Sequence, residues 1–234
     1  MSIFGAPPRI DTDNPVGLTD QQINEGWFDI HPEMAKHLRM PGPGALAGAN
    51  LAGSSKKNER KESDFYPTPP EVTQALLNTG LIPKQRLWEP ACGDGHMSEV
   101  LKRHSSSVLS TDLRQTSYTK GLPLDFLSGK SPYPQGFIEG IVTNPPFNLS
   151  TEFLETAMAH KPKVIALLLK SQYWHSQKRA ALFEKYPPAY VMALTWRSDF
   201  CFGDRGGAPT MECIWTVWIE GETDTRYRIL RKPV

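Results

Sequence analysis

The sequence predicts an α/β fold built on a mainly parallel sheet. Strand and helix patterns alternate between residues 86 and 186, and such alternation produces right-handed βαβ units with helices on both faces of the sheet. Residues 163–170 (KVIALLLK) are apolar between two lysines, as expected of a strand that is buried on both faces. Two later strand patterns, 189–197 and 211–220, are joined by a Gly-rich loop. They predict a hairpin at one edge of the sheet.

The remaining elements follow from periodicity and from helix start and stop signals. Two prolines precede a helix over 71–80, and Gly80 can end it. A helix over 150–160 begins with Ser150 or Thr151, either of which can serve as its N-cap. The other strands are expected at 86–90, at 107–113, ending at 121–124, and at 137–146, and the other helices at 96–104 and 176–186.

The first quarter of the chain differs in composition from the rest. Residues 41–63 are rich in Gly, Ala and Ser and then in charges, which is typical of a flexible linker. We therefore expect an N-terminal extension with its linker at 1–63 and one α/β domain at 64–234. Whether the extension serves dimerisation, partner binding or neither stays open.

Composition limits the class of protein. The 234 residues carry a net charge of +1, so no global basic field indicates nucleic acid, although a local patch can bind it. The three cysteines form no CxxC pair, which gives no indication of a metal cluster or a disulfide framework. We expect no metal, no membrane span and no signal peptide, and hence a cytoplasmic protein.

The first expected strand ends in a turn with two glycines, Glu89–Gly95 (EPACGDG). Ligands of open α/β sheets bind at the carboxyl ends of the strands, where glycines allow close approach to the backbone. Asp112 ends the second strand, 23 positions after Glu89, and a carboxylate there can accept both hydroxyls of a ribose. The turn lacks the third glycine of GxGxxG and the lysine of a phosphate loop, which favours a nucleoside cofactor without phosphates. An ordinary turn and a capping aspartate are the alternatives.

Asp125 and Phe126 follow the expected strand end at 121–124. Asp125 can accept from an adenine amino group, and Phe126 can cover the adenine ring. A helix cap followed by a core phenylalanine explains these two residues at least equally well.

The fourth strand end carries Asn144-Pro145-Pro146-Phe147. The two prolines fix the backbone and remove two donors. The Asn144 side chain and the Pro145 carbonyl then supply two acceptors, and Phe147 supplies a flat apolar surface. This combination suits a planar group that bears an NH2, whereas a proline-rich loop with a buried phenylalanine is the simpler alternative.

The motifs EPACGDG, TDL, DFL and TNPPF, preceded by FYPTPPEVTQALL at 65–77, resemble those of S-adenosylmethionine-dependent adenine-N6 DNA methyltransferases. Their order is similar to the gamma-type arrangement of restriction-modification and phage enzymes. The resemblance covers about residues 64–220. It implies a Rossmann-like class I methyltransferase fold with a mainly parallel seven-stranded sheet and an antiparallel edge hairpin. It also implies S-adenosyl-L-methionine as the cofactor.

The resemblance assigns roles to individual residues. Asn144 and the Pro145 carbonyl would bind the target amino group, Pro146 would belong to the same corner, and Phe147 would stack on the target base. Asp112 would bind the cofactor ribose. The cofactor-binding residues that it implies are Tyr66, Thr68, Pro69, Glu89, Ala91, Gly93, Gly95, Asp112, Leu113, Asp125, Phe126 and Asn144.

Restriction-type relatives carry a large target-recognition domain, which we do not expect here, so any recognition site would be short or relaxed. The candidate nucleic-acid contacts lie in a basic-aromatic stretch and around the Gly-rich loop. They are Trp174, Lys178, Arg179, Arg197 and Arg205. A solvated helix face and a plain hairpin connection are the alternative interpretations.

The leading hypothesis is methyl transfer to the N6 amino group of adenine in DNA. Two acceptors at the amino hydrogens would stabilise the positive charge that develops on the nitrogen, and no strong base is needed. The alternatives are an RNA adenine or guanine amino group, a protein glutamine amide, and a cofactor-binding module without activity. The expected protein is a monomer or homodimer in a bacterial or phage-infected cell, because compact enzymes of this kind occur in phages.

Overall fold

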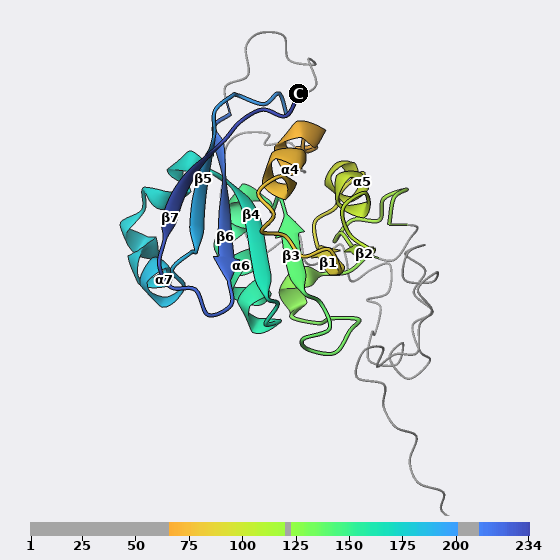
Figure 1. Cartoon of the computed structure of the whole chain (residues 1–234). Coiled ribbons are helices and arrows are strands. Elements are labelled where there is room, and N and C mark those ends of the chain that lie inside the picture. Colours follow the sequence, from red (N-terminus) through yellow and green to blue (C-terminus); the bar gives the residue numbers. More distant parts are fainter. Residues whose placement is uncertain (1–65, 120–122, 201–210) are drawn as a thin grey trace, which may run out of the picture.

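The computed structural model describes residues 66–119, 123–200 and 211–234 (Figure 1). The extension and linker expected at 1–63, the candidate contact Arg205 and the rest of the loop at 201–210 lie outside these described residues. Within them, no helix is long and apolar enough to cross a membrane.

Seven strands of the described residues form one sheet in the order β2-β1-β3-β4-β6-β5-β7 (Figure 1). The first four strands of this order run parallel to one another. β6 lies antiparallel between β4 and β5, and β7 runs parallel to β5. The strands are β1 Arg86–Glu89, β2 Ser107–Ser110, β3 Gly140–Thr143, β4 Val164–Lys170, β5 Tyr190–Leu194, β6 Cys213–Ile219 and β7 Arg226–Leu230.

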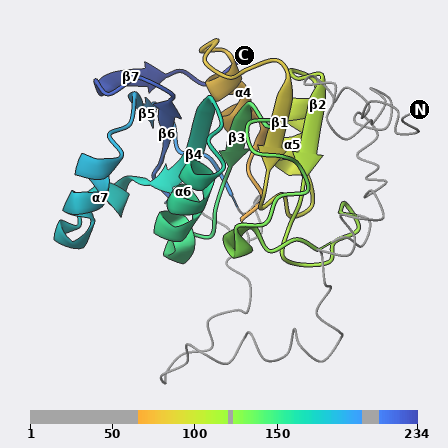
Figure 2. The ribbon, with the colours of Figure 1, turned by 90° about the horizontal axis from the view of Figure 1, so that it is seen from below.

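Helices cover both faces of the sheet, as the alternating pattern predicts. Apolar side chains of α4 and α5 form one core with the sheet, and those of α6, with α7 at its border, form a second core on the opposite face. Figure 2 shows α6 and α7 side by side on their face. The helices are α4 Pro70–Leu77, α5 His96–Lys102, α6 Ser150–Ala159 and α7 Ala180–Lys185, and the short 3-10 helices are η1 Phe126–Ser128, η2 Phe147–Leu149, η3 Ser171–Trp174 and η4 Gln177–Arg179.

β4 lies between the two cores. Every residue of this strand except Lys170 is buried. Ala166 and Leu168 belong to the core under α4 and α5, whereas Ile165 and Leu167 belong to the core under α6. The prediction of a strand buried on both faces is confirmed.

The expected strand ending at 121–124 is wrong for the residues that can be described. Pro123–Asp125 form no strand, and η1 follows directly. Pro123 has no N–H group to donate to a ladder. The Asp125 side chain accepts from the Leu127 N–H at 3.0 Å, which starts η1 instead.

The start of α6 also differs from the prediction. The N-cap position is Leu149, and neither Ser150 nor Thr151 caps the helix with its side chain. Ser150 instead donates its hydroxyl to the Phe147 carbonyl at 3.0 Å. η2 runs straight into α6, and the N–H of Leu149, at the N-cap position, donates to the Pro146 carbonyl at 2.9 Å.

The antiparallel pair of β5 and β6 was predicted, but β7 was not. β7 adds to β5 beyond this pair. Four of its five residues are exposed, and only Leu230 is buried. Arg226 and Arg228 alternate with Tyr227 and Ile229, which is a short strand pattern that we did not use.

Leu168→Ala should destabilise the protein by about 2–5 kcal/mol, because the removed atoms leave a cavity between helices and sheet. Leu168 is fully buried, whereas Ile229 on β7 is 54% exposed. Ile229→Ala is therefore the matched control, and it should change the free energy of unfolding by less than about 1 kcal/mol. Chemical denaturation of both variants measures the difference, and equal losses would contradict the burial of β4.

Candidate active site at the carboxyl edge of the sheet

The carboxyl ends of β2, β1, β3 and β4 meet at one edge of the sheet, because these neighbouring strands are parallel. Glu89 is the last residue of β1. Asp112 follows β2 by two residues, and Asn144 directly follows β3. Lys170 is the last residue of β4. The fold therefore brings together the strand ends that the sequence identified as the place for a ligand.

The turn after β1 depends on glycine. Gly93 and Gly95 have φ angles of 54° and 86°, a left-handed conformation that glycine adopts without a Cβ clash. A Cβ on Gly95 would lie 2.3 Å from the Tyr118 ring, so any other residue would displace this ring. The Gly93 N–H donates to Asp112 and the Gly95 N–H to the Cys92 carbonyl, so both N–H groups are already used within the protein.

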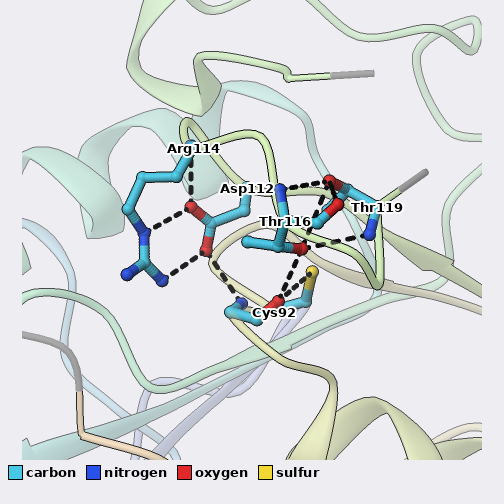
Figure 3. A network of polar contacts seen from close by, with 6 residues as sticks. Cys92, Asp112, Arg114, Thr116 and Thr119 are labelled. Carbon is cyan, nitrogen blue, oxygen red and sulfur yellow. Dashed lines mark hydrogen bonds and ion pairs between the residues drawn. The ribbon is translucent and has the colours of Figure 1, made fainter. Parts of the chain in front are cut away.

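Asp112 is buried and makes several hydrogen bonds (Figure 3). Its Oδ2 accepts from the Gly93 N–H at 2.8 Å. Its Oδ1 accepts from the backbone N–H of Arg114 at 2.8 Å and from the Arg114 Nε at 3.1 Å. The Arg114 Nη2 lies 3.4 Å from Oδ2. A ribose that bonded to Asp112 would therefore have to exchange with the Arg114 guanidinium.

Glu89 is a buried acid behind the same turn, with 2% of its surface exposed. The Ser98 hydroxyl donates to Glu89 Oε2 and lies 2.6 Å from the Ser110 hydroxyl. Burial raises the pKa of Glu89 to about 8, the charge of Asp112 adds to this, and the Ser98 hydrogen bond opposes it. Glu89 is thus mostly protonated at neutral pH in this arrangement.

The NPPF corner is tied to the segment before α4. Asn144 Nδ2 donates to the Tyr66 carbonyl at 3.2 Å and to Thr68 Oγ1 at 3.1 Å. A carbonyl oxygen can only accept, so the amide nitrogen must face Tyr66, and this fixes the orientation of the amide. Asn144 Oδ1 is buried and has no hydrogen-bond partner in the described part of the chain.

The other predicted acceptor is the Pro145 carbonyl. Among the described residues, no backbone N–H donates to it, whereas the next carbonyl, that of Pro146, accepts from the Leu149 N–H at 2.9 Å. Pro145 is buried and Pro146 is half-buried. In the part of the chain that the structure describes, neither Asn144 Oδ1 nor the Pro145 carbonyl thus accepts from a backbone N–H.

Phe147 begins η2 and is half-buried. Its ring lies 6.0 Å from the Tyr66 ring, at an interplanar angle of 32°. The Lys170 ammonium lies 4.3 Å from the centre of the Phe147 ring, in cation–π range. We did not predict Lys170 as a site residue, although its position at the end of the strand expected beside the NPPF strand was a usable signal.

The other predicted cofactor residues have mixed surroundings. Leu113 is 56% exposed beside Asp112, and Asp125 is exposed at the start of η1. Phe126 is 2% exposed and lies edge-on to Trp88, with ring centres 5.0 Å apart. Phe126 therefore has almost no surface left for a ligand, and the interpretation of these two residues as a cap and a core phenylalanine describes what the structure shows.

Ser98, Ser110 and Arg114 were not predicted as members of the site. Nothing in the sequence marks the two serines. The contact of Ser98 with Glu89, and that of Ser110 with Ser98, require α5 and β2 to lie against the end of β1. Arg114 directly follows Asp112-Leu113 in sequence, and an Arg two positions after an acid was a weak signal. Among the described residues, no group of three or more His, Cys, Asp or Glu side chains is placed to hold a metal ion.

The predicted nucleic-acid contacts are partly used within the protein. Trp174 packs on Phe183, with ring centres 4.4 Å apart. The Arg179 guanidinium lies 4.3 Å from the centre of the Tyr173 ring and donates to the Tyr173 carbonyl. Lys178 is exposed, and Arg197 is exposed but pairs with Glu212 at 2.9 Å.

Solved structures with a similar fold include three methyltransferase-related proteins. A protein described as a modification subunit of a type I restriction enzyme from Vibrio vulnificus YJ016 is 14% identical, with a TM-score of 0.52 over 73% of this chain and 48% of that one. A protein described as an RNA methyltransferase from Pyrococcus horikoshii is 13% identical, with a TM-score of 0.52 over 76% and 98%. A protein described as a class I S-adenosylmethionine-dependent methyltransferase from Listeria monocytogenes is 11% identical, with a TM-score of 0.50 over 92% and 74%.

Because the sequence identities are only 11–14%, the similarity to these structures shows the fold and not the activity. The chain has the class I methyltransferase fold, and this part of the sequence-based prediction is confirmed. The chain spans 26% of the type IIG restriction endonuclease BpuSI and 48% of the Vibrio subunit. No protein-family model and no curated protein matches the sequence, so any statement on activity depends on the geometry of the site.

Glu89→Gln should be more stable than the wild-type protein, by an amount that increases as the pH rises. The folded-state pKa of Glu89 is raised to about 8 from 4.5. Between these values the unfolded chain has lost a proton that the folded protein keeps, so this group's contribution to stability falls as the pH rises and levels off above about 8. Gln is neutral at every pH and can still accept from Ser98.

The two proteins should therefore have similar free energies of unfolding at pH 5. At pH 8.5 Glu89→Gln should be more stable by an amount on the order of a few kcal/mol. Urea titrations at the two pH values measure this. Glu155→Gln, at an exposed position of α6, is the control, and the same pH dependence in both variants would refute the raised pKa.

Proposed function

We propose that the protein transfers a methyl group from S-adenosyl-L-methionine to the exocyclic N6 amino group of adenine in DNA. The observation that carries the proposal is the pair of available acceptors at the end of β3, Asn144 Oδ1 and the Pro145 carbonyl. The class I methyltransferase fold and the motif resemblance support it.

The residues at the carboxyl edge fit this cofactor. Its chemistry when bound is an electrophilic methyl group on a positively charged sulfur. Glu89 is a buried acid with a raised pKa, and it would ionise beside the cofactor's ammonium group. Asp112 would accept the ribose hydroxyls in place of Arg114, and Leu113, which is 56% exposed, would cover the adenine. The Tyr118 ring occupies the space beside Gly95 in the free protein, and it would have to move for the cofactor to approach the turn at Gly93 and Gly95.

Further residues would complete the cofactor site. Asn144 holds Tyr66 and Thr68 at the corner, so these residues and the adjoining Pro69 would lie beside the methionine part. Ala91 would line the turn, and Asp125 is exposed and would accept from the cofactor's adenine amino group. Phe126 would support the adenine only from its buried position in η1.

Asn144 and Pro145 would act on the target nitrogen itself. The lone pair of an adenine amino group is delocalised into the ring, which makes it a poor nucleophile. Two acceptors on its hydrogens favour a pyramidal nitrogen and stabilise the positive charge that develops. As the N–C bond forms, the S–C bond breaks and S-adenosylhomocysteine is the leaving group. The extra proton on nitrogen then passes to water.

Phe147 would hold the base in place. Stacking on its half-buried ring would offset part of the cost of flipping a base out of a duplex, which is about a few kcal/mol. Lys170 lies over this ring, and a cation close to the target nitrogen would oppose the developing charge. We infer that Lys170 moves away from the ring when the base enters, or that the base stacks on the opposite face.

The NPPF corner would contact the amino group of the base and not the sugar, so it would not distinguish DNA from RNA. An RNA amino group is therefore the nearest alternative substrate, and the product distinguishes the two. Digestion of treated duplex DNA to nucleosides should yield N6-methyldeoxyadenosine by mass spectrometry. If methylated product were found in RNA alone, the substrate would be RNA, and the proposed role of Asn144 would be unchanged.

Asn144→Ala should abolish methyl transfer while leaving cofactor affinity within about threefold. Loss of one preorganised hydrogen-bonding group at a developing charge typically costs a factor of about 10²–10³ in kcat, and Asn144 also orients the Tyr66 segment. Turnover with methyl-labelled cofactor and isothermal titration calorimetry measure the two quantities.

Asn148→Ala is the matched control, because Asn148 is exposed in η2, four residues further on. It should keep normal turnover. Normal turnover in Asn144→Ala would show that the proposed acceptor pair is not used. Loss of cofactor binding in this variant, with a normal unfolding transition, would instead place Asn144 in the cofactor site alone.

A further inference from the structure

The last strand of the sheet carries a concentration of positive charge. Residues 225–234 (TRYRILRKPV) contain four cations and no acid, although the chain as a whole has a net charge of only +1. β7 forms the edge of the sheet, and residues 226–229, 231 and 232 are exposed. The cations are Arg226, Arg228, Arg231 and Lys232.

The contacts of these cations separate them into two groups. Arg226 pairs with Glu222 at 2.9 Å and donates to the Tyr190 hydroxyl at 3.0 Å, so its charge is partly compensated. The Arg228 guanidinium lies 4.5 Å from the centre of the Tyr190 ring, which positions the charge without neutralising it. In the described part of the chain, no acid forms an ion pair with Arg228, Arg231 or Lys232.

The sheet topology places this positive charge at the same edge of the sheet as the candidate active site. β7 is parallel to β5, and β5 and β4 are each antiparallel to β6, so β7 ends at the same edge as β3. The Leu230 carbonyl accepts from the Thr195 N–H at 3.0 Å and from its hydroxyl at 2.9 Å, which fixes the end of β7. In Figures 1 and 2 the C-terminus lies beside α4, the helix that follows the Tyr66 segment held by Asn144.

The spacing suits a duplex whose target base is at Asn144. Four strand-to-strand steps separate β3 from β7, or about 19 Å at about 4.8 Å for each step. A DNA duplex advances about 3.4 Å for each base pair. The cations at the end of β7 therefore lie about five or six base pairs from the position of the target base.

We propose that β7 and residues 231–232 bind the phosphate backbone of the duplex that flanks the target base. This rests on the proposed function for its substrate. A second copy of the chain suits this edge less well, because a row of cations on an edge strand repels a like strand. Phosphate contacts of this kind would add affinity without sequence specificity, which agrees with the absence of a large recognition domain among the described residues.

The test compares two pairs of exposed cations. Arg231→Gln with Lys232→Gln removes two charges beyond the end of β7. Lys84→Gln with Lys161→Gln removes two exposed charges that precede the amino ends of β1 and β4, at the opposite edge of the sheet. Affinity for a 30-base-pair duplex is measured by fluorescence anisotropy between 50 and 300 mM salt, and cofactor affinity by calorimetry.

The β7 pair should weaken DNA binding about tenfold at 100 mM salt and lower the slope of log K against log salt by about 2. The Lys84 and Lys161 pair should change neither quantity appreciably, and cofactor affinity should stay the same in both. Equal effects of the two pairs would overturn the proposal. So would a wild-type chain that does not bind duplex DNA, a change in oligomeric state with DNA affinity unchanged, or an effect confined to RNA.

Methyl transfer measured in parallel separates this inference from the proposed function. If the wild-type chain bound duplex DNA through β7 but yielded no N6-methyldeoxyadenosine, the proposed function would be refuted. The proposed DNA-binding surface would be supported. If the β7 double variant methylated DNA and bound it with full affinity, the proposed function would be supported. The proposed DNA-binding surface would be refuted.

Discussion

The burial of β4 on both faces is the constraint on which the rest of the structure depends. An apolar strand of this kind is stable only between two layers, and here α4 and α5 cover one face while α6 and α7 border the other. β6 pairs with β4 along its whole length, and β3 pairs with residues 164–167 on the other side. Because β1, β2 and β3 are parallel to β4, their carboxyl ends must meet at one edge, and each polar residue that follows a strand is delivered there.

The site at this edge holds polar groups at a cost to stability. Asn144 Oδ1 is buried without a hydrogen-bond partner among the described residues, which typically costs about 1–3 kcal/mol. Glu89 is buried close to Asp112, and both burial and this charge raise its pKa. A ligand that brought the missing donor or cation would stabilise such groups, and this cost would then be recovered as binding affinity.

Internal partners occupy several of the positions that we propose for the cofactor and the target base. The Arg114 guanidinium lies on the carboxylate of Asp112, and the Lys170 ammonium lies over the Phe147 ring. Each contact keeps a charged or aromatic group satisfied in the free protein, and binding must exchange it for a contact with the ligand. The observed affinity will therefore be the difference between two sets of contacts rather than the sum of the new ones.

The sequence by itself determined the order of most strands and helices along the chain, the double burial of β4 and the position of the candidate site residues at strand ends. These features depend on local periodicity, on turn residues such as Gly93 and Gly95, and on the short motif at Asn144–Phe147. Only the tertiary structure showed that Ser98 donates to Glu89 and contacts Ser110. It also showed that Lys170 lies over Phe147 and that Phe126 belongs to the core. It also revealed β7, where Arg226 and Arg228 alternate with Tyr227 and Ile229 over only four residues, a pattern that we did not interpret as a strand. Contacts between side chains far apart in sequence depend on how helices and strands pack, and a pattern read along the chain carries no record of this packing.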